Sequence, residues 1–297
     1  MTAAPTVSLE TADLDSRAFL PAVSRGWVIR TVLRRVVIGV SVAVIAVAVL
    51  AAFLPGLFTS RDPTAAVPAE RLRAPDAGHW FGTDELGRDL FSRVVHGAAL
   101  SLGATLLAVL VAFLVGSALG LLAGSVGGAV DTVVARVIDV MLSIPSLLLA
   151  LAVVTALGFG SVNVAIAVGF TGIGNFARVM RAEVLKVIEM DYVECASAAG
   201  VRRLTIVLRH VLPNASGSVV VLATLEFGTA ILSISSLSFL GFGAAPPAAE
   251  WGSLVADGRS YLATAWWLTT IPGLVIVAVV LSFNRISHAI DERFGVR

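Results

Sequence analysis

Apolar residues are gathered in six long stretches separated by shorter polar segments. The stretches cover approximately residues 36–54, 97–124, 133–157, 162–180, 213–241 and 266–284. A helix needs about 20 mostly apolar residues to cross a bilayer, and these stretches lack the period-two alternation of a transmembrane barrel. The pattern therefore predicts an all-α integral membrane protein with six transmembrane helices. The second and fifth stretches are long enough to tilt or to extend beyond the hydrocarbon layer.

Composition agrees with this class, and the charge distribution gives the orientation. The chain is 57% hydrophobic and only 14% charged, which leaves too little polar surface for a soluble domain. Basic residues gather before the first stretch and after the fourth, at Arg17, Arg25, Arg30, Arg34, Arg35, Arg181, Lys186, Arg202, Arg203 and Arg209. Because cytoplasmic segments are enriched in Lys and Arg, we expect both termini and the 181–212 loop to be cytoplasmic.

The stretches and their orientation divide the chain into five parts. Residues 1–35 are expected to form a cytoplasmic N-terminal segment, and residues 36–54 the first transmembrane helix. Residues 55–96 are expected to form an extracytoplasmic segment with a surface helix. A five-helix core, residues 97–290, would contain the 181–212 loop, and residues 291–297 would form a cytoplasmic tail.

The surface helix is expected from the last part of the outer segment. Thr83 is a good helix N-cap, followed by acidic residues that favour a helix N-terminus. Asp84 and Arg88, and then Asp89 and Arg93, have the i,i+4 spacing of stabilising pairs. The pattern predicts a helix that starts at about Thr83 and runs into the second stretch. At the start of the third stretch, Arg136 and Asp139 are predicted to form an interfacial pair.

Catalytic and metal-binding patterns are missing. A phosphate-binding loop needs Gly-Lys-Ser/Thr, and the only lysine, Lys186, follows Leu185. The histidines, His79, His96, His210 and His288, have no metal-ligand spacing. Cys195 is the only cysteine, so no internal disulfide can form. We expect a non-enzymatic chain with no metal or cofactor of its own.

A polar island at residues 190–213, MDYVECASAAGVRRLTIVLRHVLP, separates the fourth and fifth stretches. Its alanines favour a short helix, and Gly200 can supply the left-handed conformation that ends one. Arg202 and Arg203 then open a second short helix, and Pro213 leads back to the membrane. Such a rigid element suits docking to a soluble partner. An ordinary connecting loop is the alternative interpretation.

This island resembles the cytoplasmic coupling motif of ABC-type importer permeases. The motif reads Glu-Ala-Ala, three residues, Gly, nine residues, Ile, one residue, Leu-Pro, and here it is Glu194-Cys195-Ala196, Gly200 and Leu212-Pro213. Two positions depart from it: Cys195 replaces an alanine and His210 replaces the isoleucine. The resemblance implies that the coupling residues are Glu194, Ala196, Gly200, Arg202, Arg203, Leu212 and Pro213.

Two outer segments resemble the dipeptide, oligopeptide and nickel permeases within that group. They are FGTDELGRDLFSR at 81–93 and LSFLGFGAAPPAAEWGSLVADGRSYL at 237–262. The layout resembles the C-type subunit of the pair, with a type I importer permease fold in the bacterial inner (plasma) membrane. The outer-face residues would be Thr83, Asp84, Arg88, Asp89 and Trp251.

The resemblance implies partners as well as a fold. A second homologous permease would complete the pathway, and two ATP-binding subunits would carry ATP and magnesium. An extracytoplasmic solute-binding protein would deliver dipeptides or oligopeptides. A permease for nickel or another small solute, a self-sufficient secondary transporter and a binding scaffold are the alternatives.

Glu226 is the candidate pathway residue. Relatives commonly carry a glutamate late in the fifth span, where this sequence has Ile234, and Glu226 lies two turns earlier. An ionisable residue inside a membrane indicates function by default; a protonated carboxyl, or one paired with a neighbouring helix, is the alternative. In the second span, Gly116, Gly120 and Gly124 form a ridge of small residues that predicts close helix packing, with a moving gate as the alternative.

Overall fold

The computed structural model describes residues 25–294, with side chains for residues 34–290. It divides into a short N-terminal unit that ends at Val37 and a main unit that begins at Ile38. Most of the predicted segment 1–35, and the side chains of the predicted tail 291–297, lie outside the described residues. The first helix, α1 (Arg25–Phe53), belongs partly to each unit, and the following paragraphs concern the main unit.

Long apolar helices dominate the described chain. After α1 come α2 (Leu90–Val126), α5 (Ser161–Ile188), α8 (Leu212–Phe239) and α10 (Trp267–Phe294). Within residues 25–294, five helices are long and apolar enough to cross a membrane, and a bent pair makes a sixth candidate. The predicted all-α fold is confirmed, and counting the bent pair as one span gives the predicted six candidate crossings. Shorter helices α6 (Asp191–Ala198), α7 (Arg203–Ile206) and α9 (Trp251–Gly258) lie between the long ones.

The third predicted span is not one continuous helix. It consists of α3 (Gly128–Ser143) and α4 (Ser146–Leu157), which meet at an angle of 97°. Pro145 explains the break, because proline has no N–H to donate and disfavours helical geometry in the residue before it. Ile144 is accordingly extended, with φ −93° and ψ 132°. The expectation of an unbroken helix over 133–157 was wrong.

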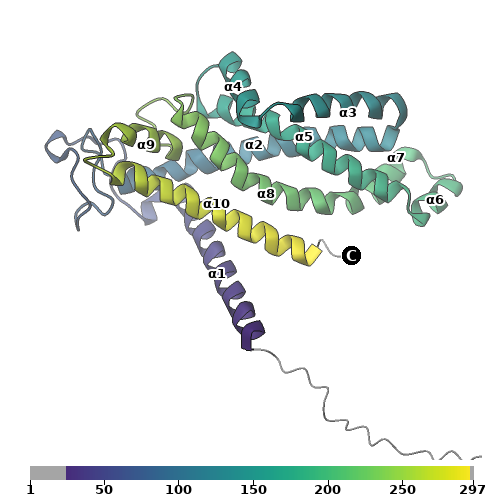
Figure 1. Cartoon of the computed structure of the whole chain (residues 1–297), viewed down its shortest axis with the longest axis horizontal. Helices are drawn as coiled ribbons and strands as arrows, with labels where there is room; N and C mark the ends of the chain where they lie inside the picture. The colour runs from purple at the N-terminus through teal and green to yellow at the C-terminus, as the bar shows by residue number, and fades with distance from the viewer. Residues whose placement is uncertain (1–24, 295–297) are drawn as a thin grey trace, which may run out of the picture. The chain divides into compact units, whose positions relative to one another are not determined.

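Helix α2 packs closely along α5, with α8 beside both (Figure 1). A Cβ atom on Gly116 would lie 2.6 Å from the carbonyl oxygen of Ile173, and one on Gly120 would overlap the carbonyl oxygen of Ala177. The two backbones therefore touch along this ridge, and the predicted close packing is confirmed. Fully buried side chains on α5, Phe176 and Val184 among them, fill the core beneath it.

The outer segment before α2 holds only two 3-10 turns, Pro55–Leu57 and Pro68–Glu70. The helix predicted from Thr83 was wrong, since α2 begins at Leu90 and Asp89 is its N-cap. Gly87 accounts for the difference. Its φ of +77° is incompatible with a right-handed helix, and a Cβ atom there would overlap the carbonyl of Val67.

Figure 1 places the polar island, residues 190–213, and the outer segments at opposite ends of the helices of the main unit. Helices α6 and α7 lie at one end, while α9 and the outer segment lie at the other. Helix α2 reaches from one region to the other, because its 37 residues extend for about 55 Å at 1.5 Å per residue.

Candidate coupling element, central cavity and outer face

The polar island folds into a helix, a tight turn and a second helix. Gly200 donates its N–H to the carbonyl of Ser197 at 3.0 Å, and Val201 donates to Ala196 at 3.2 Å. This pair of bonds ends a helix through a left-handed residue, and Gly200 has φ +76°. Ala196 and Gly200 thus define where α6 stops, as the spacing predicted. We name residues 190–213 the coupling element.

One side of the coupling element is anchored and the other is exposed. Val193 and Ile206 are buried in the main hydrophobic core. On the free side, Glu194 and Arg202 are exposed, and Leu204 is 69% exposed. The free side therefore combines charged and apolar groups, a composition suited to contact with a protein.

Arg203 has a partner inside the chain. Its guanidinium donates to the carbonyl of Ser125, and to that of Val126 at 3.4 Å. These carbonyls belong to the last turn of α2, where no N–H group of the helix is available to donate to them. Arg203 therefore ties the coupling element to the end of α2. Sequence reasoning assigned this arginine to a partner protein, and no local pattern could reveal acceptors 77 and 78 residues away.

The last part of the coupling element runs without a break into the membrane. Helix α7 continues through a π-helical turn, Val207–Val211, into α8, with Leu212 half-buried and Pro213 in the first turn of α8. Proline is tolerated in a first helical turn because the N–H it lacks has no acceptor there. The ring of His210 lies 6.4 Å from that of Tyr192 on α6, measured between centroids. His210 thus packs within the coupling element.

Ion pairs attach α3 to α5. Arg181 donates to both carboxylate oxygens of Asp131, one of them at 2.7 Å. Arg178 pairs with Asp139 at 3.3 Å across the same two helices. The predicted pairing of Arg136 with Asp139 was wrong. Helix α5 lies beside α3 and places Arg178 next to Asp139.

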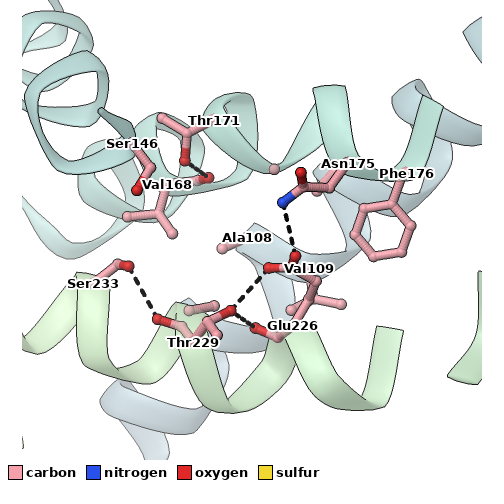
Figure 2. A pocket seen from close by; sticks show the side chains of 13 residues that line it. Ala108, Val109, Ser146, Val168, Thr171, Asn175, Phe176, Glu226, Thr229 and Ser233 are labelled. Carbon is pink, nitrogen blue, oxygen red and sulfur yellow. Dashed lines mark hydrogen bonds between the residues drawn. The ribbon is translucent and has the colours of Figure 1, made fainter. Parts of the chain in front are cut away.

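A cavity of about 210 Å³ lies halfway along α2, α5 and α8. Figure 2 shows Glu226 at its wall, where Oε1 accepts a hydrogen bond from Asn175 Nδ2 at 2.9 Å. Thr229 Oγ1 donates to Oε2 at 2.8 Å. Ser146, the first residue of α4, also lines the cavity. Ile234, which stands where the resemblance led us to expect an acidic residue, is only 2% exposed and belongs to the apolar core.

The five outer-face candidates are buried rather than exposed: Thr83, Asp84, Arg88, Asp89 and Trp251. The predicted pair of Asp84 with Arg88 is present, with an N–O distance of 2.6 Å. Asp89 is bonded at 2.7 Å to His79 rather than paired with Arg93, so that part of the expectation was wrong. These residues therefore stabilise the outer segment through buried contacts and do not form its exposed surface.

Trp251 fixes α9 to α2. Its indole N–H donates to the carbonyl of Val94 at 2.9 Å, and its backbone N–H donates to Ser101 Oγ at 3.0 Å. The exposed large side chains of this end are others, including Trp80 at 63%. Nothing in the sequence around Trp80 indicated that its side chain would be exposed.

A buried carboxyl that sequence reasoning missed holds the neighbouring loop. Glu250 is 1% exposed, and Ser238 Oγ donates to it at 2.7 Å. Burial raises the pKa of the Glu250 carboxyl above its ordinary value, and the hydrogen bond from Ser238 opposes that rise. Glu250 therefore joins the last turn of α8 to the start of α9.

Comparisons with known proteins agree on one family. The chain is 41% identical to a dipeptide transport system permease protein of Alkalihalophilus pseudofirmus, over 82% of this chain and 80% of that one. It is 44% identical to a glutathione transport system permease protein of Shigella flexneri, over 73% and 72% of the two chains. Both relatives are named as permeases.

Solved structures support the fold. An inward-facing methionine ABC transporter matches with a TM-score of 0.53 and 18% identity, over 67% of this chain and 96% of that one. An amino acid ABC transporter matches with the same score and identity, over 68% and 94%. Residues 116–296 match the family model described as "Binding-protein-dependent transport system inner membrane component". The chain therefore belongs to the family of inner-membrane permease subunits of binding-protein-dependent ABC transporters.

Proposed function

We propose that this chain is one of two permease subunits in an ATP-driven importer of dipeptides or oligopeptides. The observation that carries the proposal is the 41% identity to a dipeptide permease over four fifths of both chains. A nickel complex or another small solute is the rival cargo. Membership of the permease family disfavours a self-sufficient secondary transporter.

Within this proposal, the coupling element docks with an ATP-binding subunit that holds ATP and magnesium. Its exposed side supports this role, because Glu194 and Arg202 offer charge and Leu204 offers apolar area. Val193 and Ile206 anchor the opposite side in the core, so that force on the element reaches the membrane helices.

The remaining partners lie along and outside the membrane. A second, homologous permease completes the translocation path, and a solute-binding protein meets the outer end of this chain. The central cavity with Glu226 supports a path here, because it brings polar groups halfway along three membrane helices. The buried network around Asp84 and Asp89 holds the outer segment in shape, while Trp80 offers exposed contact area.

The test is reconstitution of the whole transporter in proteoliposomes. ATP-dependent uptake of a labelled dipeptide is expected, with little uptake of nickel. Removal of the ATP-binding subunits should abolish uptake; uptake that persists without them would refute the importer.

One substitution tests docking within the same system. Glu194→Lys should weaken the binding affinity for the ATP-binding subunit by about tenfold, roughly 1.4 kcal/mol, because it reverses an exposed charge of the coupling element. Glu194→Gln keeps the size of the side chain and should have a smaller effect. Wild-type affinity and uptake in both variants would contradict the docking role.

A further inference from the structure

Glu226 is held in the central cavity by neutral groups alone. Its two carboxylate oxygens each accept one hydrogen bond, from the amide of Asn175 and from the hydroxyl of Thr229. Among residues 34–290, none of the ion pairs involves Glu226. A carboxylate offers about four acceptor positions, so each oxygen keeps capacity for a further donor.

The surroundings of Glu226 indicate which donor fits. The cavity wall carries apolar side chains, Val109 and Val168 among them, beside the hydroxyl-bearing Thr171 and Ser233 (Figure 2). Hard divalent cations require several oxygen ligands with more than one carboxylate in most protein sites. No cluster of three or more His, Cys, Asp or Glu side chains that could hold a metal ion occurs in the part of the chain that the structure describes. A single carboxylate in a wall of mixed apolar and hydroxyl groups instead matches a cation that is itself attached to carbon.

We infer that the Glu226 cavity binds an alkylammonium group, and that this group is the α-amino end of the transported peptide. An ammonium carries three donors and one positive charge, which match the free acceptor positions and the charge of Glu226. The identification of the ammonium with cargo rests on the proposed function. A cavity of about 210 Å³ lies below the roughly 300 Å³ of typical small-molecule pockets, a size that suits the amino end of a peptide.

A thiol-labelling experiment tests the cavity independently of transport. In the assembled transporter, Ser233→Cys is placed at the cavity wall in a Cys195→Ala background, which removes the exposed native thiol. Labelling by an ethylammonium methanethiosulfonate and by its ethylsulfonate counterpart is followed by intact mass of this chain. The ratio of the two rates is the readout, because any change in thiolate fraction affects both reagents alike.

Each rate is first divided by the rate of the same reagent with a small free thiol in solution. On this normalised scale the ammonium reagent is expected to react about tenfold faster than the sulfonate reagent, the ratio expected for one charge-assisted contact. Glu226→Gln should bring the ratio close to one. Glu183→Gln is the matched control, since Glu183 also accepts a hydroxyl hydrogen bond between α5 and α8, from Ser218 at 3.1 Å, but does not line the cavity. An unchanged ratio in Glu226→Gln would overturn the inference, as would an introduced thiol that neither reagent reaches.

Peptides then identify the source of the ammonium. Alanyl-alanine should slow the ammonium reagent, and N-acetyl-alanyl-alanine should not. Equal protection by both peptides, or by neither, would overturn recognition of the cargo amine. If the charge preference is present but ATP-dependent peptide uptake is absent, the proposed function fails and the ammonium site remains.

Discussion

At Gly200 the backbone alone sets the geometry of the coupling element. Its φ is +76°, and a Cβ atom added there would meet nothing within 4 Å. A substitution therefore acts through conformational strain and not through a clash. The strain would fall on the turn that fixes the angle between α6 and α7.

Gly200→Ala should raise the rate of trypsin cleavage after Arg202 and Arg203 about fivefold. The left-handed conformation costs an alanine roughly 1 kcal/mol, which increases the population of the locally open turn. Gly200→Asn should give a smaller increase, because asparagine tolerates this conformation. Gly217→Ala, at a glycine with ordinary φ and open space, is the control; equal cleavage of Gly200→Ala and this control would contradict the prediction.

Sequence and structure agree at residues whose roles are local. The spacing from Glu194 to Gly200 predicts the turn, because both residues act within one helix and its end. The bonds of Arg203 and Glu226 could not be predicted in this way. Their partners lie 78 residues away at Ser125 and 51 residues away at Asn175, so only the packing of whole helices brings them together.

At the scale of elements, length and hydropathy were sufficient to find the membrane helices, but not their ends. Asp84 and Arg88 pair as expected, yet they do so across a turn and not along a helix. The helix signal at Thr83 was overridden by Gly87, whose neighbour Val67 leaves no space for a side chain. Pro145 was visible in the sequence and sufficient to predict the break, since it removes a donor from the helix.

The α2–α5 contact gives a prediction at this scale. Gly120→Ala should destabilise the purified subunit assembly by about 1–3 kcal/mol, because the added methyl group overlaps the α5 backbone. Thermal unfolding in mild detergent measures the change. Gly103→Ala, on the same helix but with nothing within 4 Å of the added Cβ atom, should leave the midpoint almost unchanged. Similar midpoints for both variants would show that the helices can separate without cost.

For the molecule as a whole, α2 is the element that connects the coupling end to the outer end. Arg203 joins its last turn to the coupling element, while Asp89 caps its first turn. Trp251 adds α9 to the same helix through the carbonyl of Val94. One continuous helix therefore links the coupling element to the outer segment.

The two adjacent arginines should separate docking from transmission. Arg203→Gln should lower uptake per ATP hydrolysed by about fivefold, roughly 1 kcal/mol, since it removes hydrogen bonds to α2, while affinity for the ATP-binding subunit stays within about twofold. Arg202→Gln, whose exposed side chain is free to meet a partner, should change that affinity instead. Uptake, ATP hydrolysis and affinity for the ATP-binding subunit are measured for both variants in proteoliposomes. The same changes in both variants would show that the two arginines share one role.

The bend between α3 and α4 has a consequence for hydration. The first N–H groups of α4 have no acceptors within that helix, and the last carbonyls of α3 have no donors within theirs. Lipid offers neither donors nor acceptors. Ser146 places the start of α4 against the central cavity, where water or cargo can supply the missing bonds. Under the proposed function, these groups make this part of the crossing favourable for water, so we expect the barrier to leakage of ions and protons to lie elsewhere along the path, at apolar side chains.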